Sequence, residues 1–572
     1  MPCRPHADPS RRRRAATAVV AGSLAIAAAA CSSPRGAPAP TTARPPAVSP
    51  LLAVPATGDP ATGPVGPLRA PGGPFLEDRY GRAALVHGVD LVYKVPPYEV
   101  EVTGSGPNVL TADEARQMAA LGFDVVRLGV IWKGLEPGRV GIDDPAICDP
   151  GAPRSSGPGQ FNAGAFEAYL GKLDATVALL GHYGIYSLID MHQDVYSDVF
   201  GGEGAPDWAV CTDGAKPAPQ RGVPDWSVNL RGPGVVAAYT HFWKNDVVGD
   251  LQGEFDAVWA KVAAHFRTDP YVIGYDPFNE PYGAGLPPNG NGAAFDADLE
   301  CLYTGRAHPG RSQAGKTVSC PPHDPAVGLV PRIEAADPNH LVFYEGNYTT
   351  DSGPLNHIGP MALPGLVLNF HDYCFLHVPN GPEPPDFASV CAPSEKLVFT
   401  EHAAQRADDV SAQQPRGPAW LLTEFGATTD AADLARITSD ADGALVGWIY
   451  WQWLHYDDPT GSHTSGLWPP TAPVPAMLEV LARTYASAVA GVPTVSAFDP
   501  PSGRFLLQYR ADPAITEPTV IVVPLATHYP AGYCARVSGG ARITSPPGAA
   551  DIDVHNGATA STVTVTVAAG HC

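Results

Sequence analysis

The sequence predicts an α/β fold, a (β/α)8 barrel followed by a small C-terminal antiparallel β-sandwich. Short apolar runs recur along the chain, helical patterns separate them, and both give way to β-type alternation after Gly491. Strands that alternate with helices form parallel sheets, and eight such units close into a barrel. The eight runs are Ala84–Leu91, Val125–Ile131, Tyr186–His192, Val272–Phe278, Leu341–Gly346, Leu366–Tyr373, Trp420–Phe425 and Leu445–Trp453.

Helical patterns fill the connections between these runs, as at Thr111–Leu121, Ala165–His182 and Glu254–Phe266. We expect a last barrel helix over Pro475–Ala490, where proline suits the first turn. The barrel then spans residues 71–490. An open doubly wound sheet is the competing fold, but it usually carries a glycine-rich phosphate turn after an early strand, and the sequence shows none.

Residues 491–572 lack helical patterns. The runs Phe505–Tyr509, Thr519–Val523 and Ser561–Val567 alternate or are rich in β-branched residues, and turns with proline and glycine separate them. This pattern is typical of a β-sandwich. We expect the sandwich to cap the barrel; a sugar-binding role is the alternative and has no distinctive signal.

The N-terminus predicts export. Arg11–Arg14 precede an apolar stretch of small residues that ends at Cys31, the pattern of a signal peptide over residues 1–31. Two alternatives stay open for Cys31: an acylated cysteine that anchors the chain at the cell surface, or an ordinary cleavage site. Residues 32–70, rich in Pro, Ala and Thr, predict a disordered linker. No later run reaches the roughly 18 apolar residues of a membrane span, so we expect a secreted protein.

Charge and cysteine content narrow the function. The formal net charge of −22 argues against binding to nucleic acid, which needs a basic surface. The ten cysteines leave an even number once Cys3 and Cys31 are set aside, which indicates disulfides in an exported protein. Other pairings stay open, but proximity favours Cys301–Cys320, Cys374–Cys391 and Cys534–Cys572, which leaves Cys148–Cys211.

Polar or aromatic side chains follow nearly every predicted barrel strand. The carboxyl ends of the strands meet at one rim, which carries the active site in barrels of this kind. A purely structural barrel would not need such residues, so we predict a site there. The positions are Arg127, Asp190–Asp194, Asn279–Pro281, His371–Tyr373, Thr423–Gly426, Trp448, Trp451 and Trp453.

Two glutamates stand out among them. Glu280 directly follows an apolar strand, and Glu424 lies inside one. A buried ionised glutamate is costly unless it is paired, so one alone would fit either a structural ion pair or a functional site. Two of them, on the fourth and seventh strands, favour function. Paired carboxyl groups hydrolyse glycosidic bonds: one donates a proton to the leaving oxygen, and the other attacks the anomeric carbon.

Their neighbours suggest which glutamate does which. Arg127 favours the ionised form of a nearby carboxyl group, and Tyr373 can donate a hydrogen bond to it. We assign both as helpers of Glu424, the predicted nucleophile. Glu280 then faces a negative charge that keeps it protonated, so it is the predicted acid/base. Asn279 can bind the 2-hydroxyl of the sugar.

The tryptophans of the eighth predicted strand can form a floor for a sugar ring. Core packing is the alternative for each of them. Strand alternation puts Trp451 and Trp453 on one side and Trp448 on the other, and we favour Trp451.

Other chemistries have weaker support. The sequence has no G-x-S-x-G elbow, no H-E-x-x-H helix and no phosphate-binding loop. A metal hydrolase stays an alternative, although no pair of ligands shows tight spacing. Hydrolysis by two carboxyl groups needs no metal or organic cofactor, so we expect none.

These residues resemble glycoside hydrolase family 5 over about residues 73–490. The resemblance implies a (β/α)8 barrel, net retention of anomeric configuration, Glu280 as acid/base and Glu424 as nucleophile. The matching residues are Arg127, His192, Asn279, Glu280, Pro281, His371, Tyr373, Glu424 and Trp451.

Within that family the chain looks most like the endoglycoceramidases, through residues 81–98, 188–209 and 275–281. This resemblance implies cleavage between an oligosaccharide and ceramide, with a glycolipid as partner and contact with a membrane surface or micelle. We expect a monomer. The resemblance also suggests four sugar-contacting residues: Lys94, Asp190, His192 and Asp194.

Alternatives remain for the substrate. Splitting sugar from lipid needs an apolar surface, for which Phe200, Trp208 and Trp226 are candidates; packing inside the loops is the other interpretation. The chain could instead be a β-glycanase or an exo-β-glycosidase that acts on a soluble or other lipid-linked sugar. A non-catalytic sugar-binding protein is less favoured, because both glutamates are present.

Overall fold

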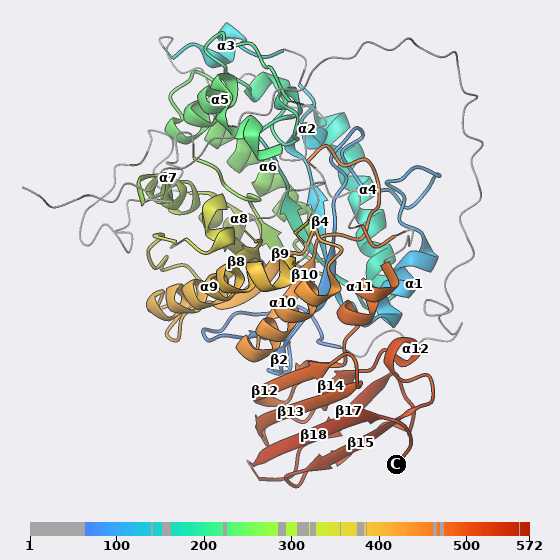
Figure 1. Ribbon diagram of the computed structural model, residues 1–572. Helices are drawn as coiled ribbons and strands as arrows, with labels where there is room; N and C mark the ends of the chain where they lie inside the picture. Colours follow the sequence, from blue (N-terminus) through green and yellow to red (C-terminus); the bar gives the residue numbers. More distant parts are fainter. Residues whose placement is uncertain are drawn as a thin grey trace, which may run out of the picture. The chain divides into compact units, whose positions relative to one another are not determined.

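Eight parallel strands close into a barrel in the computed structural model (Figure 1), in the order β10-β3-β4-β5-β6-β7-β8-β9. Each strand overlaps one of the eight predicted runs, so the predicted fold class is confirmed. The barrel strands are β3 (His87–Leu91), β4 (Val125–Val130), β5 (Tyr186–Met191), β6 (Val272–Asp276), β7 (Leu341–Glu345), β8 (Leu366–Asp372), β9 (Ala419–Phe425) and β10 (Gly447–Tyr450).

The structure describes residues 63–138, 141–150, 162–220, 226–283, 293–305, 320, 328–354, 356–374, 383–384, 386–460, 466–468, 474–559 and 561–572. The predicted signal peptide, Cys31 and residues 32–62 of the predicted linker lie outside them. The linker prediction is wrong for residues 63–70, because Leu68 is buried and the N–H of Gly66 donates to the hydroxyl of Tyr186 at 2.7 Å.

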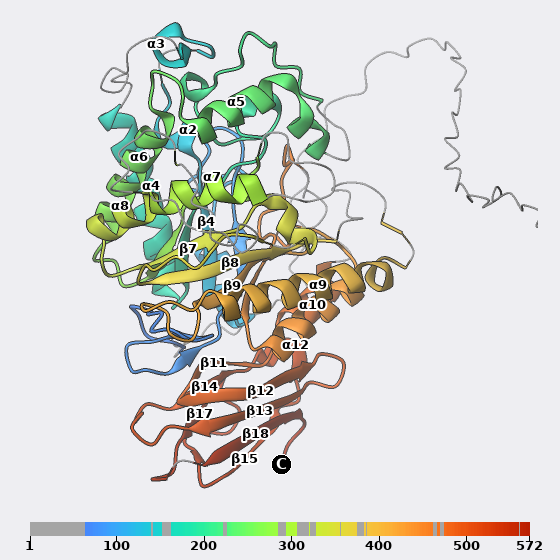
Figure 2. The ribbon, with the colours of Figure 1, turned by 90° about the vertical axis from the view of Figure 1, so that its left-hand side faces the viewer.

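Helices cover the outside of the barrel. Figures 1 and 2 show α9 (Phe387–Asp408) and α10 (Ala431–Ala444) side by side next to β8 and β9. None of the helices in the described ranges is long and apolar enough to span a membrane. The others that precede the C-terminal sheets are α1 (Ala112–Ala120), α2 (Trp132–Leu135), α3 (Pro145–Cys148), α4 (Ala163–His182), α5 (Pro233–Lys244), α6 (Leu251–Phe266), α7 (Ala293–Thr304), α8 (Leu329–Ala336) and α11 (Val474–Leu481). The short helix α12 (Leu525–His528) belongs to the C-terminal region, between two of its strands.

Side-chain caps fix where several helices begin. Thr111 and Glu114 form a capping box at α1, in which each side chain accepts the backbone N–H of the other residue. At α4 and α10 only the cap residue takes part: the side chains of Asn162 and Asp430 accept backbone N–H groups of the first helical turn. Such caps satisfy N–H groups that the helix leaves unpaired.

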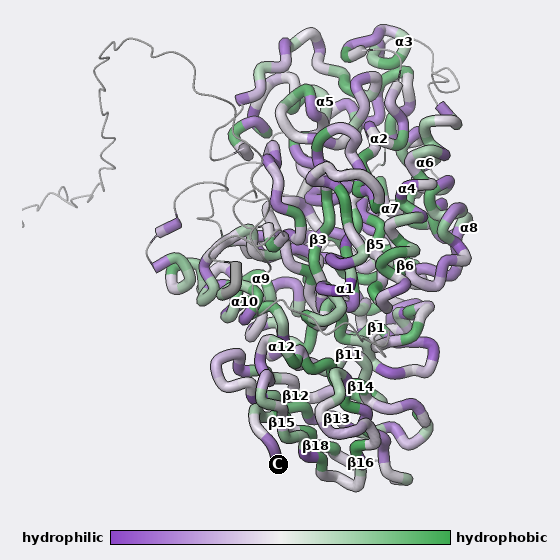
Figure 3. Tube along the Cα trace, turned by 90° about the vertical axis from the view of Figure 1, so that its right-hand side faces the viewer, coloured by the Kyte–Doolittle hydropathy of each residue, from purple (hydrophilic) through white to green (hydrophobic). Residues whose placement is uncertain are grey.

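Every residue of the eight barrel strands is buried. Figure 3 shows hydrophobic residues at barrel strands such as β5 and β6. The polar side chains on these strands therefore lie away from water and need partners inside the protein.

Two antiparallel sheets follow the barrel, as predicted. One has the order β1-β2-β11-β14-β17-β16 and the other β12-β13-β18-β15. Segments that precede the barrel supply two strands of the first sheet, β1 and β2. The bounds are β1 (Leu76–Glu77), β2 (Ala83–Ala84), β11 (Tyr485–Val489), β12 (Gly491–Asp499), β13 (Arg504–Ala511), β14 (Thr519–Val522), β15 (Tyr533–Ser538), β16 (Arg542–Ile543), β17 (Asp551–His555) and β18 (Thr562–Ala569).

Two sequence predictions of local structure are wrong. The helix expected over Pro475–Ala490 ends at Leu481, and Tyr485–Val489 form β11 between β2 and β14. Alanines in that segment favour a helix, but pairing with neighbouring strands overrides their local preference. The first barrel strand begins at His87 instead of Ala84, because Ala84 belongs to β2.

Among the described residues, four disulfides cross-link loops, helices and the C-terminal sheets. They are the four predicted pairs, and their Cα atoms lie 4.8–5.4 Å apart. The Cys148–Cys211 bridge ties α3 to the loop after β5, and the Cys374–Cys391 bridge ties the loop after β8 to α9. The two bridges join loops at the carboxyl ends of the barrel strands and restrict how far these loops can separate.

Candidate active site

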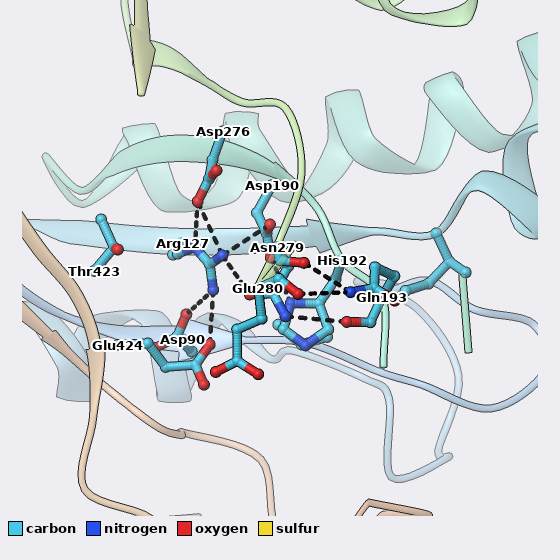
Figure 4. A network of polar contacts seen from close by, with 12 residues as sticks. Asp90, Arg127, Asp190, His192, Gln193, Asp276, Asn279, Glu280, Thr423 and Glu424 are labelled. Carbon is cyan, nitrogen blue, oxygen red and sulfur yellow. Dashed lines mark hydrogen bonds and ion pairs between the residues drawn. The ribbon is translucent and has the colours of Figure 1, made fainter. Parts of the chain in front are cut away.

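Arg127 on β4 organises the carboxyl ends of the barrel strands (Figure 4). Its guanidinium is fully buried and donates to acceptors from four other strands or their ends. A guanidinium suits this position because it offers five N–H donors in a rigid plane. The acceptors are Asp90 at 3.3 Å, Asp190 at 2.9 Å, Asp276 at 2.9 Å, Asn279 at 2.8 Å and Glu424 at 2.8 Å.

Glu424 on β9 receives two direct hydrogen bonds. Nη1 of Arg127 donates to its Oε2 at 2.8 Å, and the hydroxyl of Tyr373 donates to its Oε1 at 2.8 Å. Both partners are those that the sequence assigned to this residue. Both stabilise a carboxylate more than a carboxylic acid.

Glu280 lies just beyond β6 in an unusual backbone conformation. Its φ is +41°, the left-handed region that residues other than glycine rarely adopt. Its N–H donates to Oε2 of Glu345 at 3.0 Å, and the side chain of Gln193 donates to its carbonyl oxygen at 3.1 Å. Its carboxyl Oε1 lies 3.0 Å from Nδ1 of His371. Backbone and side chain are thus both held.

The carboxyl groups of Glu280 and Glu424 face the same space in Figure 4. One oxygen of each, together with a ring nitrogen of His371, lie within 4.8 Å of one another. Burial, with the Asp194 charge as the next cause, raises the pKa of Glu280 to about 8. Burial raises the pKa of Glu424 to about 7; His371 and Arg127 lower it, and the charge of Glu280 adds to the increase.

His371 lies between the two glutamates. Burial lowers the pKa of its ring to about 4, so the ring is neutral at pH 7 and carries one proton. Its Nδ1 lies 3.0 Å from Glu280, 3.5 Å from Glu345 and 4.0 Å from Glu424. Because all three neighbours are carboxyl oxygens, we assign the proton to Nδ1.

Lys94, Asp194 and Trp451 come together on another side of the site. The ammonium of Lys94 donates to Asp194 at 2.6 Å and to the Thr460 hydroxyl at 2.8 Å. It also lies 4.2 Å from the ring centre of Trp451, within the range of a cation–π contact. The predicted sugar-contacting residues Lys94 and Asp194 are therefore buried partners of each other, and Lys94 is not a surface lysine.

His192 stacks on Trp451, with ring centres 5.1 Å apart. Its Nδ1 lies 2.7 Å from one oxygen of Asp190, whose other oxygen accepts from Arg127. Both oxygens of Asp190 therefore have protein partners, and its contact with a sugar stays a prediction. Asp190 stands behind His192 and orients the ring.

The other tryptophans of β10 and the following loop pack elsewhere. Trp448 stacks on His87 at 4.3 Å, and Trp453 stacks on Trp468 at 5.5 Å. Both are buried. Of the three, only Trp451 lies beside Lys94 and His192, as favoured from the sequence.

Sequence reasoning missed several residues of this network. Asp90, Asp276 and Glu345 are acids at or next to the last position of apolar strands, which is the signal that singled out the other residues at the strand ends. Gln193 lies within the predicted rim positions but received no role, although its amide donates to the carbonyl oxygens of Asn279 and Glu280. The partners of Gln193 are backbone carbonyl groups, and a sequence motif built from side chains does not reveal such contacts.

Three aromatic residues were candidates for an apolar surface. Phe200 and Trp208 are buried inside the loops, so the packing interpretation holds for them. Trp226 is partly exposed, and its ring lies 6.1 Å from that of Tyr348. Trp226 is the one of the three that can face a ligand.

Three groups of side chains here have the donor types of a cation site. His192, Asp194 and Glu203 form the first, Glu345, Asp351 and His371 form the second, and Glu280, His371 and Glu424 form the third. In the first group the ammonium of Lys94 already binds Asp194 and lies 3.9 Å from Glu203. The ammonium of Lys94 thus supplies positive charge beside Asp194 and Glu203, where a bound metal ion would otherwise lie.

Comparison with known proteins agrees with this arrangement. Residues 93–457 match the family described as Cellulase (glycosyl hydrolase family 5), and residues 483–567 match the Glycoside hydrolase family 5 C-terminal domain. Endoglycoceramidase I of Rhodococcus hoagii (strain 103S) is 30% identical over 520 residues, which is 86% of this chain and 87% of that protein. The endoglycoceramidase of Hydra vulgaris is 27% identical over 500 residues, 82% of this chain and 83% of that protein.

A solved structure has the same fold. Endo-glycoceramidase II from Rhodococcus sp., in a complex with ganglioside GM3, superposes with a TM-score of 0.63 at 23% identity. The match covers 87% of this chain and 100% of that chain.

Proposed function

The chain belongs to glycoside hydrolase family 5 and is an O-glycosyl hydrolase; we propose that it is a retaining endo-β-glycosidase. In this proposal it separates a glycan from ceramide or a similar lipid aglycone. The observation that carries the mechanism is the approach of Glu280 and Glu424 oxygens to within 4.8 Å. Retaining enzymes hold their carboxyl groups about 5–5.5 Å apart, whereas inverting enzymes need about 6.5–9.5 Å to admit a water.

Glu424 is the proposed nucleophile. Its carboxylate attacks the anomeric carbon while the bond from that carbon to the aglycone oxygen breaks. The proton of Glu280 moves to that oxygen, and the aglycone leaves as an alcohol. Arg127 and Tyr373 support this role because they stabilise the carboxylate of Glu424 before it attacks.

Glu280 is the proposed acid/base in both steps. After the first step it is a carboxylate and takes a proton from water, while the oxygen of that water attacks the anomeric carbon. The ester bond to Glu424 breaks, and the glycan leaves with its original configuration. His371 lies 3.0 Å from Glu280. Its N–H can donate to the Glu280 carboxylate that forms in the first step and so stabilise that form.

The sugar would lie against the side chains opposite the glutamates. We propose that Trp451 stacks on the ring and that Lys94, His192 and Asp194 bind hydroxyl groups. We propose that the Asn279 amide binds the 2-hydroxyl; in support, its orientation is fixed, because its Oδ1 accepts from Arg127 and its Nδ2 donates to the carbonyl oxygen of Gln193. Asp190 supports His192.

The relatives support a lipid aglycone, because they are named endoglycoceramidases and the match covers most of their length. A glycolipid substrate implies work at a membrane surface or micelle, and we propose a monomeric enzyme. Secretion is supported by four disulfides, which are typical of oxidising compartments.

Incubation with detergent-dispersed lactosylceramide and gangliosides tests the proposal. Mass spectrometry should find intact glycans together with intact ceramide. Glu424→Gln and Glu280→Gln should each release neither. Single monosaccharides would indicate an exo-β-glycosidase, and cleavage of cello-oligosaccharides without any lipid product would indicate a β-glycanase.

A further inference from the structure

Glu345 contacts both the backbone and the side-chain partner of Glu280. It is the last residue of β7 and is fully buried. Its Oε2 accepts the N–H of Glu280 at 3.0 Å, and its Oε1 lies 3.5 Å from Nδ1 of His371. The same Nδ1 lies 3.0 Å from the Glu280 carboxyl group. One carboxyl group thus contacts Glu280 directly and through His371.

The backbone conformation of Glu280 depends on hydrogen bonds of this kind. Its φ of +41° is strained for a residue with a side chain, and strained conformations persist only where the surroundings enforce them. On the carbonyl side, Gln193 binds the oxygens of Asn279 and Glu280 at 2.9 and 3.1 Å. On the N–H side, the acceptor is Glu345. Without it, a buried N–H would lose its hydrogen bond and the peptide would turn to find another.

We propose that Glu345 is a positioning residue for proton transfer, which fixes the Glu280 carboxyl group towards the leaving oxygen through its N–H and through the ring of His371. This inference rests on the proposed function, in which Glu280 is the acid/base.

Glu345 is itself held firmly. Its carbonyl oxygen accepts from the hydroxyl of Tyr303 at 3.0 Å, and β7 lies between β6 and β8 in the barrel, so the strand cannot shift sideways. Burial, with the Asp351 charge next, raises the pKa of its carboxyl group well above the usual range. Its titratable neighbours come from several elements: Arg127, Asp276, Glu280, Asp351 and His371.

Substrates with different leaving groups separate positioning of the acid from a general loss of structure. Phenyl β-lactoside needs a proton on its leaving oxygen, whereas 2,4-dinitrophenyl β-lactoside does not. In Glu345→Leu we expect kcat/KM for the phenyl substrate to fall on the order of 10–100-fold, because acid catalysis contributes roughly 100–10,000-fold. For the dinitrophenyl substrate kcat/KM should stay within about 3-fold, because the attack by Glu424 is untouched.

The second step gives an independent readout. It needs Glu280 as base, so kcat for the dinitrophenyl substrate should also fall in Glu345→Leu. Azide attacks without a base and should restore that kcat. Glu345→Gln keeps an acceptor for the N–H of Glu280 and should recover part of the lost activity. Equal losses on both lactosides, without rescue by azide, would overturn the inference.

Glu300 offers a matched control. It is a buried glutamate on α7 whose Oε1 accepts the backbone N–H of Gly359, but it is not part of the site. Glu300→Gln should keep both rates. Glu280→Gln tells the two proposals apart: if it leaves the phenyl substrate rate unchanged, the proposed function is wrong. If it behaves as an acid/base variant while Glu345→Leu matches wild type, only this inference fails.

Discussion

Replacement of Arg127 by lysine tests the centre of the network. Lysine keeps the positive charge among the surrounding carboxyl groups, so the fold should survive. It offers a compact ammonium in place of the planar guanidinium that reaches acceptors from four strand ends. The ammonium cannot bind Glu424 and Asp276 at once in the way that Nη1 and Nε do at 2.8 and 2.9 Å.

The magnitude follows from the bond to Glu424. A hydrogen bond to a charged group contributes about 1.5–3 kcal/mol. If that contribution is lost from the transition state, kcat/KM should fall roughly 10–150-fold. Arg127→Met goes further, because it leaves several buried acids without their cation, and breaking such a pair costs about 3–5 kcal/mol of stability.

The assay is kcat/KM on an aryl β-lactoside, with thermal melting measured in parallel. Arg127→Lys should lower kcat/KM while its melting temperature stays close to that of the wild type. The acid limb of its pH profile should move to higher pH, because Glu424 binds its proton more tightly without the guanidinium. An Arg127→Lys enzyme with wild-type rate and pH profile would refute the view that Arg127 prepares the nucleophile.

Three further outcomes are expected. The pH profile of kcat/KM should be bell-shaped: activity is lost as pH falls through the pKa of Glu424, about 7, and as it rises through that of Glu280, about 8; a flat profile between about pH 5 and 9 would contradict the pair. Trp451→Ala should lower kcat/KM about 10–100-fold through the lost apolar contact with the sugar, without a shift in pH optimum. Replacement of both Cys534 and Cys572 by serine removes a disulfide that closes a loop of 38 residues. The free energy of unfolding, measured by calorimetry, should fall by about 4 kcal/mol by the chain-entropy relation, and turnover at 25 °C should be unchanged.

Much of the fold could be predicted because barrel strands are buried on both faces. Runs such as Val125–Val130 are apolar except for a single functional residue, and their spacing by helices is visible in the sequence. The strand Tyr485–Val489 escaped because its alanines carry no alternation. Its structure comes from pairing with β2, which lies about 400 residues earlier in the chain, and no local pattern reports such a contact.

The site was predictable to the extent that its chemistry lies in side-chain type and strand position. Glu280, Glu424 and Arg127 could be found in that way. The contribution of Glu345 could not, because it depends on a backbone N–H whose direction follows from the φ of Glu280. The second contact of Asp190, with Arg127 on β4, depends on the packing of β4 against β5, which the sequence does not contain.

The balance of charge explains why one glutamate keeps its proton. Glu424 bonds directly to Arg127, whereas within the described residues the ion-pair partner nearest to Glu280 is His371, whose ring is neutral near pH 7. Buried carboxyl groups near this rim outnumber the buried cations Arg127 and Lys94, so they cannot all ionise in a medium of low dielectric. Protons stay on the carboxyl groups that lack a bonded cation, and the proposed acid/base Glu280 is such a group. The same shortage of cations that makes these acids costly to bury therefore supplies a protonated acid near neutral pH.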